Sequence, residues 1–537
     1  MSGNELAIHP IDLAIIIAYL VGIVALGCWA GMKQRKSSVG KGYFLAGSTL
    51  TWPVIGLALF STNISTIHLV SLAQEGFVNG LAYGNFEWMA AFTLVLLALF
   101  FAPFYIKANV ATLPDFLEKR YSRSSRDFLA VISIVSAIFI HIGFSLYTGA
   151  VVLRGLFGIN IMTSIIITSL LTGLYTIIGG LLAVVITESI QTIVLVLGAV
   201  CITAIAYSKV GGWEGLASSV DPVKLTVLRS ADDPSGLPWY AVFLGYPIIG
   251  IWYWCADQTI VQRVLGAKDE NHARIGPLFA GFLKILPVFI FVMPGLMCLA
   301  LINQGKLPNT LTDSADTYAF MISELLPIGV KGIVAAALLA ALMSTVSGAL
   351  NSIATLFSFD IYKRWKPETS DKKLVLVGRI VTFVAMVTAI IWSPYVSHFQ
   401  SIFQGVIAII CYVAPPITAV FLCGVFWKRA SATAAITTFY TGTLLGFTVF
   451  MLDWFKEQTG WNIPSMMATF YLFVVCMGIM FVISMVKPHS HTEESARLVW
   501  DNPLDALRGK TWPGIGNYKF LSALLCIIMV ILYVVFG

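Results

Sequence analysis

Long apolar runs recur along the whole chain and restrict its fold more than any other feature of the sequence. A run of roughly 18 apolar residues can cross a bilayer as a helix. About fourteen such runs occur, near 10–32, 50–72, 80–106, 127–156, 159–178, 182–207, 239–261, 275–302, 328–359, 374–394, 397–422, 431–452, 464–486 and 518–536. Only 11% of the residues are charged, whereas soluble chains are about a quarter charged. Since lipid offers the backbone no hydrogen-bond partners, the sequence predicts an all-α polytopic membrane protein of about 14 transmembrane helices.

Basic residues gather in alternate loops and predict how the chain is oriented. Loops on the cytoplasmic side of membrane proteins are enriched in Lys and Arg, so both termini are predicted outside the cell membrane. The net charge of +6 then reflects topology rather than nucleic-acid binding. Run 10–32 has no basic region before it, which favours a retained helix over a signal peptide. The basic residues of these loops are Lys33, Arg35, Lys36, Lys119, Arg120, Arg123, Arg126, Arg263, Lys268, Arg274, Lys363, Arg364, Lys366, Lys428 and Arg429.

Two of the apolar runs are interrupted at the depth of the membrane. The second run contains the polar stretch 61–68, and the seventh contains Gly245, Pro247 and Gly250 followed by the stretch 252–258. Broken helices survive in lipid only where they line a cavity or pack inside protein. The two interruptions lie five runs apart, which indicates two inverted five-helix repeats. Paired broken helices of this kind are typical of secondary transporters with a site at mid-membrane.

Several motifs, in order from about residue 40 to 430, resemble the solute:sodium symporter family, and most closely its sodium–glucose cotransporter branch. They are Asn63-Ile64-Ser65 with His68, Phe86-Glu87-Trp88, Gly179-Gly180-Leu181 leading to Thr187-Glu188, Trp252-Tyr253-Trp254 with Asp257-Gln258 and Gln262-Arg263, Ser344-Thr345 with Asn351-Ser352, Asp360-Ile361-Tyr362, and Pro415-Pro416 leading to Phe426-Trp427-Lys428-Arg429.

The resemblance implies a LeuT-type fold of two inverted five-helix repeats, with one helix before this core and three after it. The implied divisions are 1–49 for an N-terminal helix and cytoplasmic loop, 50–210 and 211–425 for the two repeats, and 426–537 for the C-terminal helices. It also implies a function, the symport of Na+ with a sugar or sugar-like polyol by alternating access. Such a protein is not an enzyme, and the chain has no phosphate-binding loop, metal-ligand cluster or nucleophile motif.

The resemblance places a core sodium site at the first interruption. Its ligands would be the carbonyls of Ser61, Ile64 and Ala341 and the hydroxyls of Ser344 and Thr345. Carbonyls of unwound backbone and Ser or Thr hydroxyls bind a dehydrated cation without burying a further charge. The alternative is that Ser344 and Thr345 only hydrogen-bond their own helix.

The resemblance also implies the substrate site. Hydroxyl-binding groups would be Asn63, His68, Glu87 and Lys284, with Tyr253 as the ring-stacking residue and with Trp254 and Phe403 nearby. Leu72, Phe86 and Tyr253 match gate positions. An aromatic face suits the C–H face of a pyranose. The alternative for Glu87 and Lys284 is an ion pair that never touches substrate.

Three positions depart from the pattern of the glucose and galactose carriers. Ile407 replaces a sugar-binding glutamine, Gly250 replaces a polar residue, and His141 replaces an amide or a lysine. Other solutes therefore stay open: an inositol, a sugar acid or a small carboxylate. Proton coupling through Glu188 or Asp257 is a further alternative to sodium.

A second sodium site is also predicted from the resemblance, formed by Ser344, Ser347 and Glu188. Ser344 and Ser347 are three residues apart and share one helix face. The alternative is that Glu188 pairs with a basic residue and Ser347 hydrogen-bonds its own backbone.

Overall fold

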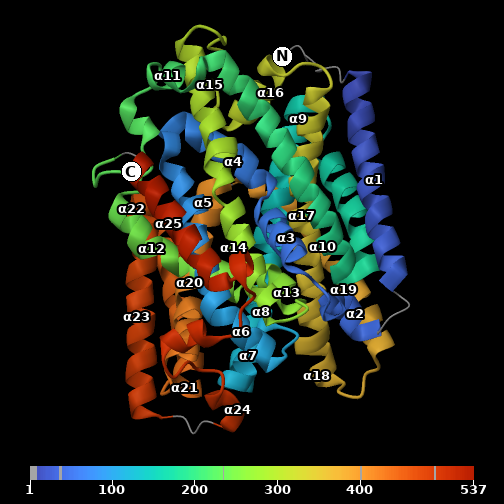
Figure 1. The fold of residues 1–537 in the computed structure, drawn as a ribbon, viewed down its shortest axis with the longest axis vertical. Coiled ribbons are helices and arrows are strands. Elements are labelled where there is room, and N and C mark those ends of the chain that lie inside the picture. The colour runs from blue at the N-terminus through green and yellow to red at the C-terminus, as the bar shows by residue number, and fades with distance from the viewer. Residues whose placement is uncertain (1–8, 35–38, 234, 399–401, 489–491) are drawn as a thin grey trace.

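The structure, a computed structural model, describes residues 9–34, 39–233, 235–398, 402–488 and 492–537. Long helices run side by side between two ends of the molecule, where short connections join them (Figure 1). Within these ranges there is no β-sheet, and only single bridges pair Leu50 with Ala267 and Arg229 with Pro238. The predicted all-α class is confirmed.

The helices of the first part of the chain are α1 (Pro10–Gln34), α2 (Val39–Leu45), α3 (Trp52–Asn63), α4 (Thr66–Asn79), α5 (Asn85–Leu96), α6 (Ala102–Ala108), α7 (Leu113–Arg120), α8 (Arg123–Ser136), α9 (Gly143–Phe157) and α10 (Ile161–Val210). Those of the middle part are α11 (Gly212–Ala217), α12 (Trp239–Ile251), α13 (Gln258–Leu265), α14 (Glu270–Leu283), α15 (Met293–Asn303), α16 (Thr317–Leu325), α17 (Val330–Leu356), α18 (Lys363–Trp365), α19 (Asp371–Trp392) and α20 (Ile402–Phe426). The last part holds α21 (Ala432–Trp454), α22 (Lys456–Thr459), α23 (Ser465–Val486), α24 (Glu493–Ala496) and α25 (Tyr518–Phe536).

Eleven helical segments of the described residues are long and apolar enough to cross a membrane, and several join shorter helices through π-helical or 3-10 turns, as Thr66–Ala108 joins α4, α5 and α6. This number differs from the fourteen predicted. One reason is α10, whose 50 residues join two predicted spans across a kink at Gly180 (φ 59°, ψ −155°). A side chain there would meet the Tyr43 carbonyl at 2.3 Å, so only glycine fits. The other reason is that α3, α12 and α13 are each shorter than a span. The count of fourteen stays a prediction.

Both predicted interruptions are present. Between α3 and α4, Ile64 and Ser65 have extended backbones, and Ser65 and His68 form a capping box that begins α4. Between α12 and α13, a π-helical turn at Trp252–Ala256 is followed by the extended Asp257, whose carboxylate accepts a hydrogen bond from the Thr259 amide at 2.7 Å. Each break therefore has a side chain that satisfies the amides freed at the start of the next helix.

Helix α17 lies at the centre of this arrangement. In its most apolar 18-residue window, 94% of the residues are buried, and it packs against both α3 and α10. Helix α1 covers α10 and α17 from outside (Figure 1). Its Asp12 carboxylate accepts hydrogen bonds from the Gly329 and Gly332 amides at 2.8 and 2.7 Å. These amides lie at the N-terminus of α17, where a carboxylate is favourable.

Ion pairs tie together the elements at one end of the molecule. Helices α7, α18 and α24 lie at the lower end in Figure 1, whereas α11 and α16 lie at the upper end, toward which α1 begins and α25 ends. At the lower end, Arg126 pairs with Asp115, Glu118 and Asp360, and so ties α8 to α7 and to the residues that follow α17. Of the predicted cytoplasmic basic residues, Lys119 and Arg120 belong to α7, and Lys363 and Arg364 to α18, whereas Arg35 and Lys36 lie outside the described residues.

Candidate functional site

A cavity of about 900 Å³, its open mouth included, lies between the two interrupted helices. This volume is of the size that small-molecule sites have. Helices α3, α4, α5, α9, α12, α17 and α20 contribute to its wall, together with the π-helical turns Ala137–Ile142 and Trp252–Ala256. Its lining residues are Asn63, Ser65, Ile67, His68, Leu72, Phe86, Glu87, Ile140, His141, Ser145, Tyr246, Ile249, Gly250, Tyr253, Trp254, Lys284, Thr345, Val406, Ile407 and Ile410.

One part of the wall is a chain of hydrogen-bonded polar side chains. The Lys284 ammonium lies at the C-terminal cap of α14, donates to the Asn63 side-chain carbonyl at 2.6 Å and pairs with the Glu87 carboxylate. The Asn63 amide in turn donates to the Tyr253 hydroxyl at 3.1 Å. His68 Nε2 lies 3.9 Å from the other oxygen of Glu87. Lys284 and Glu87 are only 1% and 2% exposed, so each charge depends on the other for compensation.

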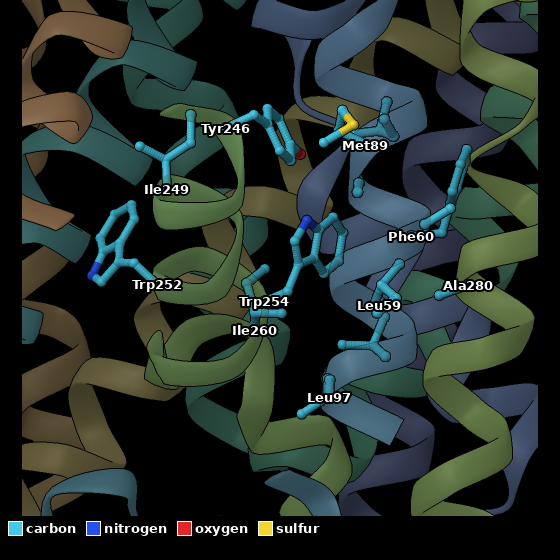
Figure 2. Close-up of a cluster of buried hydrophobic side chains, with 14 of the residues drawn as sticks. Leu59, Phe60, Met89, Leu97, Tyr246, Ile249, Trp252, Trp254, Ile260 and Ala280 are labelled. Atoms are coloured by element: carbon cyan, nitrogen blue, oxygen red, sulfur yellow. The ribbon is translucent and has the colours of Figure 1, made fainter. Parts of the chain in front are cut away.

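Aromatic rings stand beside this polar chain. Tyr253 is half-buried and faces the cavity, and the Trp254 ring lies under the Lys284 ammonium at 5.5 Å. The two neighbouring tryptophans point in opposite directions. Trp254 points toward α5 and α14, whereas Trp252 points to the other side of its helix (Figure 2). Tyr253 therefore offers a ring face beside donors and acceptors, which suits a ligand with both C–H and hydroxyl surfaces.

A set of oxygen atoms lies where the end of α3 meets α17. The Ser344 hydroxyl donates to the Ser61 carbonyl at 2.9 Å and to the Ala341 carbonyl at 3.1 Å. The Thr345 hydroxyl donates to the Thr62 carbonyl at 3.2 Å. All are buried, and the Ser61 hydroxyl has no hydrogen-bond partner within the described ranges. Because hydroxyls can rotate and offer lone pairs instead of protons, this set could hold a hard monovalent cation.

The described residues contain no group of three or more His, Cys, Asp or Glu that could hold a transition metal. Neutral carbonyl and hydroxyl oxygens match an alkali cation better. Four of the five predicted sodium ligands, Ser61, Ala341, Ser344 and Thr345, meet at this position, and the fifth, Ile64, begins the break itself. Thr345 also lines the cavity, so the two candidate sites share a residue.

The residues of the predicted second sodium site have other partners. Glu188 forms a fully buried ion pair with Arg263 and accepts a hydrogen bond from the Thr62 hydroxyl at 2.8 Å. The Ser347 hydroxyl donates to the Ser344 carbonyl of its own helix at 3.0 Å. This arrangement matches the alternative stated for these residues. The charge of Glu188 is already compensated by a guanidinium, so the second site stays a prediction without support from these contacts.

The predicted substrate and gate residues lie together. Asn63, His68, Leu72, Phe86, Glu87, Tyr253, Trp254 and Lys284 all line the cavity. Phe403 lies in the first turn of α20, and its side chain lies outside the described part of the chain. A second hollow, of about 1000 Å³ with its open mouth included, is lined by residues of 453–466 and by Ser235 and shares Phe86 and Ile407 with the cavity. These two side chains therefore stand between the cavity and the loops of α21–α23.

Several lining residues were not predicted from the sequence. Tyr246, Ile249, Gly250 and Tyr253 follow one another at helical spacing, so a search along one face from Tyr253 would have found the first two. The same holds for Val406 and Ile410, on either side of Ile407 in α20. Ser145 lies four residues after His141, so the same search from His141 would have found it, and Ile140 directly precedes His141 in the π-helical turn Ala137–Ile142.

Known proteins resemble this chain over most of its length. A sequence model of the Sodium:solute symporter family matches residues 43–442. The chain is 35% identical to sodium/myo-inositol cotransporter 2 of Sus scrofa, over 85% of this chain and 72% of that protein. It is 34% identical to sodium/glucose cotransporter 1 of Ovis aries, over 91% of this chain and 80% of that protein.

Among solved structures, the outward-open, substrate-bound form of a Na+-coupled sialic acid symporter superposes with a TM-score of 0.78. The likeness covers 90% of this chain and 100% of that one at 23% identity, and it confirms the predicted LeuT-type fold.

The buried pair gives a prediction about stability. Lys284→Met leaves the Glu87 carboxylate buried without a counter-charge, which typically costs about 3–5 kcal/mol, and Glu87→Gln strands the ammonium in the same way. The double variant removes both charges and should be closer to wild type than either single variant. Thermal unfolding of the purified protein in detergent measures this. Glu75→Gln, which removes a buried carboxylate bonded to Asn79, is the control. If the double variant lost as much thermal stability as the two single variants together, the result would contradict the pairing of Lys284 with Glu87.

Proposed function

Because this chain belongs to the sodium:solute symporter family, we propose that it moves a sugar or cyclic polyol together with Na+ through the cavity between its interrupted helices. The relatives named for glucose and for myo-inositol match the chain about equally well. Both solutes are six-membered rings that carry hydroxyls around the rim. The proposed substrate class is therefore the polyhydroxylated ring. The protein is a multi-pass membrane transporter, and we propose no enzymatic activity.

The observation that carries the substrate proposal is the polar chain next to the Tyr253 ring. A ring hydroxyl both donates and accepts hydrogen bonds, and the polar chain of the cavity wall offers both kinds of partner. Glu87 accepts, Lys284 donates, and Asn63 does both. A ring stacked on Tyr253 would place its rim hydroxyls within reach of these groups. They would exchange hydrogen bonds with the substrate rather than only with one another.

Cation coupling is supported by the position of the oxygen set. Na+ would bind the carbonyls of Ser61, Ile64 and Ala341 with the hydroxyls of Ser344 and Thr345. The ion would thereby join the broken α3 to the buried α17. Asn63 of the polar chain lies one residue from Thr62 and two from Ser61, so an ion that fixes this end of α3 also fixes a substrate-binding side chain.

Alternating access would use the two breaks as hinges, because extended residues between short helices absorb changes in φ and ψ. We propose the predicted divisions for this motion, with the repeats at 50–210 and 211–425. The basic end that carries α7 and α18 would face the cytoplasm, and both termini would lie outside the cell membrane.

An anionic solute, such as a sugar acid or a small carboxylate, has weaker support. It would need a free positive charge in the cavity, but the Lys284 ammonium is already compensated by Glu87. Proton coupling through Glu188 is likewise weakly supported, since that carboxylate is paired with Arg263. A cyclic polyol such as an inositol fits the same neutral chemistry as a sugar.

The sodium assignment predicts a loss of coupling. In the Ser344→Ala/Thr345→Ala variant, two of the ligands are gone while the helix keeps its propensity, so Na+-driven accumulation should fall to the level seen without a gradient. Accumulation by purified protein in liposomes, with labelled D-glucose and labelled myo-inositol, is the measurement. Ser352→Ala, a buried hydroxyl further along α17, is the matched control and should keep its accumulation. Undiminished accumulation by the double variant would refute this ion site.

The second sodium site predicts a change of stoichiometry. If Ser347 and Glu188 hold a second ion, the ratio of Na+ to solute should fall from two to one in Ser347→Ala. Each charge moved adds about 2.3 kcal/mol of driving force per 100 mV. The reversal potential of the solute-dependent current measures the ratio in both proteins. A ratio of one in wild type would rule out the second site and agree with the Glu188–Arg263 pair.

A further inference from the structure

Helix α20 gives aliphatic residues to the cavity wall, whereas the turn Ala137–Ile142 gives both Ile140 and His141, and α4 gives both aliphatic and polar residues. The polar chain comes from α3, α5, the end of α14 and the turn that follows α12. Among the described side chains of α20, which begin at Gly405, three line the cavity, and all three are aliphatic: Val406, Ile407 and Ile410. They recur at positions one and four residues apart, so they form one continuous strip on that helix.

Further aliphatic side chains extend this strip. Ile249 of α12 and Ile140 of the Ala137–Ile142 turn also line the cavity, and Gly250 adds no side chain that could reach a ligand. Helix α20 packs against α12 and against the turn that carries Tyr253. We call Ile140, Ile249, Val406, Ile407 and Ile410 the aliphatic wall. A substrate on Tyr253 would therefore touch the polar chain and the aliphatic wall at once.

The aliphatic wall offers little to a hydroxyl group. The backbone of α20 and α12 is helical where these residues lie, so its amides and carbonyls are used within the helices. The nearest polar side chain on α12 is Tyr246, whose hydroxyl already donates to the Phe86 carbonyl at 2.8 Å. A substrate hydroxyl pressed against this wall would lose water without gaining a partner, which is unfavourable. A methyl group at the same place would gain burial.

We propose that the preferred substrates of this site are amphipathic rings: deoxy sugars, or sugars and cyclic polyols that carry an O-methyl group, with Ile407 as a specificity-determining residue. The inference rests on the proposed function, because it assigns a narrower substrate class to the same cavity. The hydroxyls that remain on the ring bind the polar chain, and the deoxygenated or methylated position faces the aliphatic wall.

Matched solute pairs test the proposal. D-Fucose differs from D-galactose, and D-quinovose from D-glucose, only by lacking the hydroxyl on the exocyclic carbon. A mono-O-methyl ether of myo-inositol differs from its parent by one methyl group. Na+-driven currents or uptake in liposomes that contain the full-length protein give the half-saturating concentration of each member. In at least one pair, the less polar member should have a half-saturating concentration roughly tenfold lower, the discrimination typical of one methyl-sized group in an apolar pocket.

Two variants of Ile407 and one control locate the preference. Ile407→Gln supplies a donor and an acceptor on the aliphatic wall. The ratio of the half-saturating concentration of the more polar member of the preferred pair to that of the less polar member should therefore fall to about one or below one. Ile407→Val keeps the wall aliphatic and should keep the preference, even where Ile407→Gln fails to fold. Ile409→Gln places the same side chain on a residue of α20 that does not line the cavity, and it should leave the ratio unchanged.

The outcomes separate this inference from the proposed function. The inference would be overturned if, in every pair, the more polar solute had a half-saturating concentration equal to or lower than that of the less polar one. Na+-driven transport of both solutes would then leave the proposed function intact. An equal slowing of both members in Ile407→Gln, with the ratio unchanged, would also overturn it, because the wall would then act only as a gate. Failure of every member to move with Na+ would contradict the proposed function itself.

Discussion

Backbone groups that cannot find water must find partners inside the protein, and the break at Ile64–Ser65 shows how this chain meets that requirement. Where α3 ends, the Ser61 and Thr62 carbonyls receive hydroxyls from α17, and Ser65 and His68 cap the start of α4. An unsatisfied group in a membrane costs several kcal/mol, so α17 has to lie against the break. The contacts that make the interruption tolerable are the same oxygens that could hold a cation.

The substrate cavity depends on a second compensation. Lys284 and Glu87 are almost completely buried, and either charge alone would be unstable at that depth. Paired, and linked through Asn63 to Tyr253, they form a neutral polar surface rather than an anion or cation site. Asn63 ends α3 and Thr345 of α17 lines the cavity. The ion and substrate sites are thus built from the same helix end and the same partner helix.

The sequence predicted the fold class and the two breaks from local patterns, whereas the residues of the candidate site were predicted from the family resemblance. Apolar runs mark the helices, and polar or glycine-rich stretches inside them mark the breaks. The number of spans was less accessible, since the 50-residue α10 turns at a single glycine without a polar loop. The contacts between residues far apart in the chain were the hardest feature to predict from the sequence. Nothing in the sequence around Glu188 shows that Arg263, 75 residues later, compensates its charge, or that Val406 and Ile410 join Ile407 in one wall.

The central claim is that ion and substrate share the break in α3 and its partner α17, and binding linkage tests it most directly. Two sites that stabilise the same local structure must strengthen each other, and by the same factor in both directions. Isothermal titration of purified protein with substrate in Na+ and in K+ buffer, and with Na+ in the presence and absence of substrate, measures both factors. The account predicts a substrate Kd at least about fivefold lower in Na+ and an equal effect of substrate on Na+. A substrate Kd that is the same in both buffers would contradict it.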